Sequence, residues 1–211
     1  MKNIYDPLSG LYAISDDLLT PRRSILAQTE AVLRGGARLF QLRDKRSSDE
    51  ELAPIARSLR ELCDDYGAKL IINDRLELAK NAHGVHIGQA DETLEKALQT
   101  LGKAAIIGVS CYGDLNRAVA AQKRGASYVS FGACFRSVTK PNAAIVDGNI
   151  FERAKKTLQI PICAIGGITT KNAPELLRRG VDMLAVVSDL WRRDDWQKTA
   201  ETFAASLAMK S

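Results

Sequence analysis

The sequence predicts an α/β protein, a single compact (β/α)₈ barrel covering residues 1–211. Short apolar segments alternate with polar stretches of helical periodicity along the chain, and no linker or low-complexity region interrupts them. Each unit is only about 20–30 residues long, so we expect no large insertion. A doubly wound open sheet is the alternative, but it more often carries a glycine fingerprint after its first strand, where this chain has Asp16-Asp17.

Eight apolar segments are expected to be strands. They are rich in β-branched residues and nearly continuous rather than alternating, which is typical of parallel strands covered on both faces. In chain order they are residues 11–14, 39–42, 70–72, 85–87, 105–109, 128–131, 162–165 and 183–187.

Polar stretches between these segments are expected to be helices, for example 49–66, 114–124 and 171–179. One side of 49–66 gathers Leu52, Ile55, Ala56, Leu59 and Leu62. Glycine is favoured in the left-handed conformation directly after a helix, and basic residues before it suit the negative end of the helix dipole. Four glycines stand at this place before a predicted strand: Gly36, Gly67, Gly125 and Gly180.

Composition favours a globular protein that handles small molecules. Hydrophobic residues make up 45% and charged residues 26% of the chain, which is ordinary for a globular domain. A net charge of +5 could indicate nucleic-acid binding, but the basic residues are scattered in pairs such as Arg22-Arg23 and Arg192-Arg193. Aromatic residues are 6% and do not interleave with a basic run, so we expect no nucleic-acid partner.

We also expect no membrane partner and a cytoplasmic location. The first fifteen residues lack the apolar core of a secretory signal, and no apolar run approaches the roughly 20 residues that span a bilayer. Widely separated cysteines with no CxxC pair suggest buried thiols rather than a zinc site or a disulfide scaffold: Cys63, Cys111, Cys134 and Cys163. The sequence leaves the oligomeric state open, a homo-oligomer included.

The segment 41–45, QLRDK, carries the most specific chemical signal. Alternate side chains of a strand share a face, so Gln41, Arg43 and Lys45 would point the same way at the carboxyl end of the second predicted strand. One amide and two cations there suit a phosphate or pyrophosphate, because unpaired charge is costly to bury. The alternative is a strand that frays into a basic surface loop.

Other polar residues follow the remaining strands, and barrel active sites form at this rim. Asp74 and Asp91 are candidate Mg²⁺ ligands, with a helix N-cap as the alternative for each, especially for Asp91. Gly166-Gly167 would let backbone N–H groups approach a phosphate, or would form an ordinary tight turn. For the histidines His83 and His86 we favour packing or a local hydrogen bond over a metal or acid/base role.

Taken together, these motifs resemble the thiamine phosphate synthase family over nearly the whole chain. The resemblance rests on QLRDK at 41–45, IINDR at 71–75, GVHIGQAD at 84–91, IGVSCY at 107–112, SVTK at 137–140, AIGGI at 164–168 and AVVS at 185–188. It implies a Mg²⁺-dependent transferase that joins hydroxymethylpyrimidine pyrophosphate to thiazole phosphate and releases pyrophosphate.

The resemblance also implies roles for individual residues. Asp74 and Asp91 would hold the metal, and the catalytic groups would be Arg43, Lys45, Ser110 and Lys140. The pyrimidine pyrophosphate would contact Gln41, Arg43, Lys45, Asn73, Ser110 and Lys140. The thiazole phosphate would contact Ser137, Thr139, Gly167, Val187 and Ser188.

One departure from the family pattern and three competing functions remain. The family commonly has Pro-Thr where this chain has Arg136-Ser137, and we favour a solvent-facing Arg136 over an extra phosphate contact. A thiazole tautomerase is the nearest alternative, but it would not need the metal and pyrophosphate set. Another phosphate-binding barrel isomerase or epimerase would need an acid/base pair at the rim. A phosphate sensor without catalysis would bind ligand without turnover.

Overall fold

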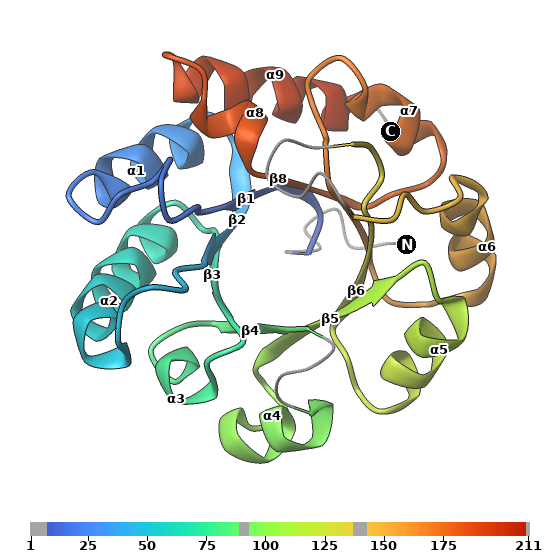
Figure 1. Ribbon diagram of the computed structural model, residues 1–211, viewed down its shortest axis with the longest axis horizontal. Coiled ribbons are helices and arrows are strands. Elements are labelled where there is room, and N and C mark those ends of the chain that lie inside the picture. Colours follow the sequence, from blue (N-terminus) through green and yellow to red (C-terminus); the bar gives the residue numbers. More distant parts are fainter. Residues whose placement is uncertain (1–7, 89–92, 137–142, 210–211) are drawn as a thin grey trace.

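The computed structural model describes residues 8–88, 93–136 and 143–209. Its parallel strands form a closed barrel in the order β1 to β8, and β8 pairs with β1 to close it. Helices surround the ring of strands on the outside (Figure 1). The predicted (β/α)₈ fold is confirmed.

The strands lie where the apolar segments predicted them. β5 differs most, because it continues to Tyr112 through an irregularity in its pairing with β6 between Ser110 and Tyr112. The strands are β1 (Gly10–Ile14), β2 (Ala37–Leu42), β3 (Lys69–Asn73), β4 (Gly84–Ile87), β5 (Ile106–Tyr112), β6 (Tyr128–Phe131), β7 (Ile162–Ile165) and β8 (Met183–Val186).

The helices follow local capping signals. Helix α2 begins with a capping box, in which Ser48 and Glu51 satisfy each other's backbone N–H groups. The helix predicted at 171–179 begins later, because the Asn172 side chain closes a turn onto the Thr169 N–H. The helices are α1 (Ile25–Arg34), α2 (Asp49–Asp65), α3 (Leu76–Ala79), α4 (Leu94–Leu101), α5 (Leu115–Lys123), α6 (Asn149–Thr157), α7 (Ala173–Arg178), α8 (Ser188–Trp191) and α9 (Trp196–Ala208).

The glycines predicted after helices have positive φ angles. The values are 94° at Gly36, 64° at Gly67, 97° at Gly125 and 93° at Gly180. A side chain would be strained in this conformation, so these glycines let each helix end and turn into the next strand.

Two apolar layers hold the barrel together. The larger layer fills the space between strands and helices, and a smaller one fills the barrel interior with residues such as Tyr12, Leu39, Ile71 and Tyr128. Leu39 and Gln41 both point inward from β2, as the two-residue period of a strand requires. All four cysteines are buried and free, as predicted, and burial raises the pKa of Cys63 to about 12.

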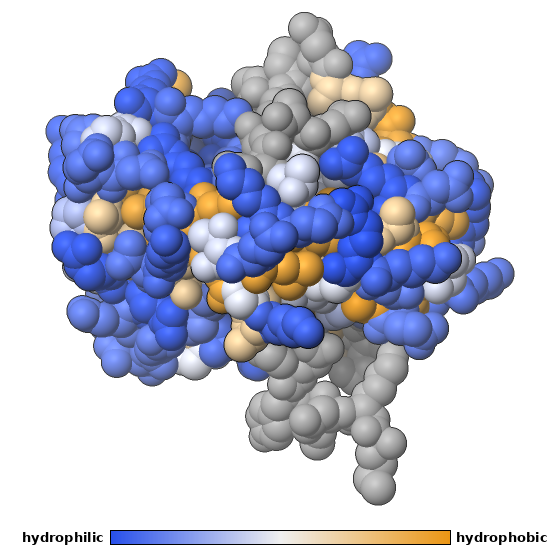
Figure 2. Space-filling view, turned by 90° about the horizontal axis from the view of Figure 1, so that it is seen from below, coloured by the Kyte–Doolittle hydropathy of each residue, from blue (hydrophilic) through white to orange (hydrophobic). Residues whose placement is uncertain are grey.

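One face of the molecule is mostly polar. Figure 2 shows a largely hydrophilic face with apolar patches between polar side chains. Within the described ranges, no helix is both long and apolar enough to cross a bilayer.

Candidate active site

A cavity of about 980 Å³ opens at the carboxyl ends of the strands. Its lining brings together seven predicted site residues, which lie in or just after five of the eight strands. Those residues are Gln41, Arg43, Asn73, Ser110, Gly167, Val187 and Ser188. Because they are scattered over almost 150 positions of the sequence, only barrel closure places them in one site.

The backbone around Arg43 is fixed by the neighbouring strand. The Arg43 N–H donates to Ser15 Oγ at 2.7 Å, and this hydroxyl donates to the Arg43 carbonyl at 3.1 Å. Ser15 is buried at the end of β1. This exchange anchors Arg43 at the cavity wall, where it supplies positive charge for an anionic ligand.

Lys45 is placed differently from Gln41 and Arg43. It is exposed and does not line the cavity, and its backbone N–H donates to Asp17 Oδ1 at 3.1 Å. The reason is that β2 ends at Leu42, so the alternation of a strand no longer governs position 45. The expectation that all three side chains share one face therefore holds for the first two.

Arg75 ties down the segment between β2 and α2. Its Nη2 group donates to the carbonyls of Asp44 at 2.9 Å and Ser47 at 2.8 Å, and its Nη1 group donates to Asp49 Oδ1 at 2.6 Å. This segment follows Arg43 directly. Arg75 thus links the end of β3 to the loop that carries the predicted pyrophosphate contacts.

Asp74, the first predicted metal ligand, follows β3 in a left-handed conformation with φ of 63°. Its Oδ1 atom accepts from the Gly88 N–H at 3.1 Å, and its Oδ2 atom accepts from Asn73 Nδ2 at 2.5 Å. Such a backbone conformation is uncommon for a residue other than glycine and is typical of functional sites. The two hydrogen bonds orient the carboxylate at the end of β3.

Asp91, the second predicted ligand, lies outside the described residues. The alternative that Asp91 caps the following helix is wrong, because α4 begins after Thr93, whose hydroxyl accepts from the Lys96 N–H at 3.2 Å. Three predicted contacts on the loop after β6 also lie outside the described residues: Ser137, Thr139 and Lys140.

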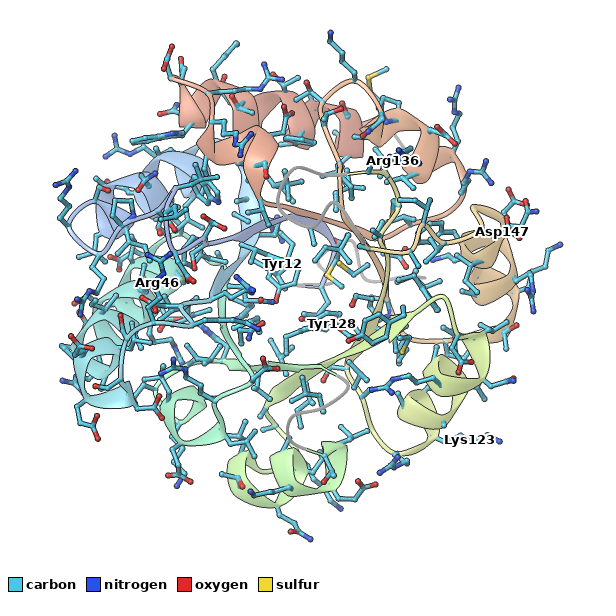
Figure 3. All side chains as sticks on the ribbon, in the orientation of Figure 1. Tyr12, Arg46, Lys123, Tyr128, Arg136 and Asp147 are labelled. Carbon is cyan, nitrogen blue, oxygen red and sulfur yellow. The ribbon has the colours of Figure 1, made fainter. Side chains whose placement is uncertain are left out.

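A chain of buried hydrogen bonds crosses the floor of the cavity. Gln41 Nε2 donates to the Tyr12 hydroxyl at 2.7 Å, which lies 2.9 Å from the Tyr128 hydroxyl. His86 connects this oxygen to Ser110, with 2.9 Å from Nδ1 to the Tyr128 hydroxyl and 2.9 Å from Nε2 to Ser110 Oγ. We call these five residues the relay: Gln41, Tyr12, Tyr128, His86 and Ser110. Figure 3 shows Tyr12 and Tyr128 in the middle of the barrel.

The relay is electrically neutral near pH 7. Burial lowers the pKa of His86 to about 4, and burial raises the pKa of Tyr12 and Tyr128 above their usual value. The imidazole of His86 also stacks on the ring of Tyr128, with centroids 5.5 Å apart. The packing and local hydrogen bonds expected at His86 are thus present.

Room for this arrangement comes from Gly108 on β5, which pairs with both His86 and Tyr128. A Cβ atom added there would lie 2.1 Å from Cζ of Tyr128. The glycine is required because the phenol ring occupies the space that a side chain would fill.

The opposite wall of the cavity is formed by the ends of β7 and β8. Gly167 has a φ of 65°, and a Cβ atom there would lie 2.6 Å from the carbonyl oxygens of Phe135 and Arg136. The chain therefore needs glycine at this close approach. Arg136 is exposed, as predicted, yet it also lines the cavity.

Sequence reasoning missed residues that line the cavity or belong to the relay beneath it. Tyr12 and Tyr128 read as ordinary core aromatics, and Arg192 read as part of a scattered basic pair. Their only local signal is their place in or just after a predicted strand. The sequence around a tyrosine or arginine at such a place does not indicate whether its side chain points into the barrel.

The other histidine, His83, belongs to the opposite end of β4 and stabilises the scaffold. Its Nδ1 atom accepts from the Leu70 N–H at 2.9 Å, and its Nε2 atom lies 2.8 Å from Asp64 Oδ1. Burial, together with the charges of Arg60 and Lys69, lowers its pKa to about 4. The expected local hydrogen bond is confirmed here as well.

Fold and cavity together define a (β/α)₈ barrel with a small-molecule site at the carboxyl ends of its strands. Residues 11–190 match the family model of thiamine monophosphate synthase. The chain belongs to this family, as the sequence motifs indicated.

Individual relatives agree with the family match. The thiamine-phosphate synthase of Thioalkalivibrio sulfidiphilus is 47% identical over 200 residues, covering 94% of this chain and 95% of that protein. The Wolinella succinogenes protein of the same name is 47% identical over 188 residues, covering 87% and 86%. The structure of thiamine phosphate pyrophosphorylase from Pyrococcus furiosus superposes with a TM-score of 0.89 at 32% identity and covers 99% of both chains.

Proposed function

We propose that this protein is a thiamine phosphate synthase that joins hydroxymethylpyrimidine pyrophosphate to thiazole phosphate. The observation that carries the proposal is the single cavity that gathers Gln41, Arg43, Asn73 and Ser110 on one side and Gly167, Val187 and Ser188 on the other. Two walls of different composition suit two substrates. The names of the relatives favour this reaction over a thiazole tautomerase or another isomerase.

In this reaction the bond between the pyrimidine methylene carbon and pyrophosphate oxygen breaks, and the oxygen keeps the electron pair. The thiazole nitrogen uses its lone pair to form the new carbon–nitrogen bond. Arg43 would bind the pyrophosphate and neutralise charge as it leaves, and Lys45 and Lys140 would add to this effect. The residues of the chain thus act by positioning two substrates and by stabilising the leaving group.

Magnesium fits the residues at the ends of β3 and β4. Mg²⁺ prefers one or two carboxylates together with water and substrate phosphates, and the Asp74 carboxylate is already oriented by two hydrogen bonds. We propose that Asp74 and Asp91 hold the ion. When bound, it would act as a Lewis acid on the pyrophosphate.

The thiazole phosphate would occupy the β7–β8 wall. Gly167 lines the cavity without a side chain, and Arg136 brings a cation to the rim of the cavity. We propose that Gly167, Val187 and Ser188 contact this substrate, with Ser137 and Thr139 completing the site from the loop after β6.

The test is to incubate the protein with both substrates, with and without Mg²⁺, and to measure thiamine phosphate and pyrophosphate. We expect equal amounts of the two products with Mg²⁺ and none in excess chelator. Asp74→Ala should reduce turnover by about a hundredfold or more, whereas Asp65→Ala, an exposed carboxylate at the end of α2, should leave it unchanged. Absence of thiamine phosphate under all conditions would refute the proposal.

A further inference from the structure

With Gln41 Nε2 facing the Tyr12 hydroxyl, the hydrogen bonds of the relay have one direction in which every hydroxyl proton has a partner. Gln41 Nε2 donates to the Tyr12 oxygen, so the Tyr12 proton must go to Tyr128, its other neighbour at hydrogen-bond distance. If Tyr128 donated to Tyr12 instead, the proton of the fully buried Tyr12 would have no partner in the relay. Leaving a buried donor unpaired is unfavourable.

The same reasoning assigns the proton of His86. The Tyr128 hydroxyl accepts from Tyr12 and therefore donates to Nδ1 of His86. A neutral imidazole carries a single N–H group, so this proton is on Nε2 and is donated to Ser110 Oγ. Ser110 keeps its own proton for an acceptor in the cavity that it lines.

We propose that the relay makes the Ser110 hydroxyl a donor and the Gln41 carbonyl an acceptor toward one substrate ring. The positioning residues are Tyr12, Tyr128 and His86, which act through the two ends. The inference rests on the proposed function, because it concerns the pyrimidine half of that reaction.

The donor at Ser110 and the acceptor at Gln41 match the hydrogen-bonding groups of an aminopyrimidine. Such a ring presents the N–H donors of its amino group beside the lone pair of a ring nitrogen. Ser110 would donate to the ring nitrogen, and Gln41 would accept from the amino group. A serine hydroxyl alone could donate or accept, so a fixed direction turns an unselective contact into a selective one.

The environment of the relay prevents its polarity from reversing freely. The Tyr12 and Tyr128 rings pack edge to face with centroids 6.0 Å apart, and neither side chain reaches solvent. Gly108 admits the Tyr128 ring into this layer without a gap. Hydrogen bonds between buried groups are strong, and leaving one member of the relay unpaired is unfavourable.

Two substitutions at one position separate the inference from a structural role. The amide of His86→Asn reaches about as far as Nδ1, so it keeps a partner for Tyr128 and loses the donor to Ser110. The longer His86→Gln reaches about as far as Nε2 and keeps that donor. Each variant is compared with wild type for binding of hydroxymethylpyrimidine pyrophosphate and of its analogue in which the ring nitrogen beside the amino-bearing carbon is CH.

Wild type should bind the pyrimidine roughly two- to tenfold more tightly than this analogue. The ratio should fall to about one in His86→Asn and be largely kept in His86→Gln, with unchanged affinity for inorganic pyrophosphate in both. A ratio kept in folded His86→Asn would overturn the inference. Failure of wild type to bind the pyrimidine substrate would instead overturn the proposed function.

A measurement on the wild-type protein covers the case in which the variants do not fold. The ¹⁵N chemical shifts of the imidazole distinguish a protonated nitrogen from a bare one. The chain has two histidines, so a His83→Gln sample assigns the signals. We expect the Nε2–H tautomer at His86, and an Nδ1–H tautomer would refute the direction of the relay.

Discussion

Replacing Arg75 by alanine should loosen the loop between β2 and α2. The side chain is 25% exposed and makes an ion pair with Asp49 and two hydrogen bonds to backbone carbonyls. A partly exposed ion pair contributes up to about 1 kcal/mol, and each carbonyl bond about 0.5–1.5 kcal/mol. The free energy of unfolding should therefore fall by about 1–4 kcal/mol.

For a chain of this size, this loss corresponds to a melting temperature lower by about 2–16 °C. Turnover should fall as well, because Arg43 precedes the loosened loop and Lys45 lies within it. Differential scanning calorimetry and the synthase assay measure the two effects. Arg75→Lys should recover the ion pair with Asp49 but not the forked contact to both carbonyls, and so fall between wild type and alanine.

Arg60→Ala is a matched control, since Arg60 pairs with Asp64 on the exposed face of α2, where such a pair contributes at most about 0.5 kcal/mol. A melting temperature of Arg75→Ala within about 1 °C of the control would refute the argument that Arg75 fixes this loop.

Three further predictions concern the barrel floor, the cationic wall and pH. Gly108→Ala should destabilise the fold by about 3 kcal/mol or more, because its Cβ atom would overlap Tyr128, whereas Gly113→Ala, with its nearest contact at 3.4 Å, should have little effect in the same thermal melts. Arg43→Ala should lower kcat by about a hundredfold with little change in melting temperature, and a variant that unfolds but works normally in its folded fraction would make Arg43 structural. Both histidines have pKa values lowered to about 4, so the unfolded chain binds protons first as pH falls. Denaturant titrations should therefore show stability fully present above about pH 6.5 and decreasing from there toward pH 4, and a flat profile over this window would contradict the assignment.

Much of the architecture could be predicted from local sequence. The strands at Tyr128–Phe131 and Ile162–Ile165 begin and end where the apolar runs do. The glycines after helices have the left-handed conformation that their positions predicted. These features depend on near neighbours in the chain, because backbone conformation and side-chain periodicity are set within a few residues.

The site was predicted in part. Gln41 reaches the cavity because the alternation of β2 carries it there, and Ser110 does so from β5. Arg43 follows the strand and is held at the cavity wall by its hydrogen bonds to Ser15. The same alternation fails for Lys45, since the strand ends at Leu42. Where a strand ends depends on its pairing with neighbours, and the segment itself gives no sign of that limit.

Sequence by itself determined the alternation of strands and helices, the rim at which polar residues collect, and the family to which the chain belongs. Tertiary structure alone decided that Tyr12 and Tyr128, 116 positions apart, meet over Gly108 and connect Gln41 to Ser110. Their contact depends on the register of strands around a closed barrel. Register is a long-range property, because it is fixed by pairing between segments whose separation in sequence has no local signature.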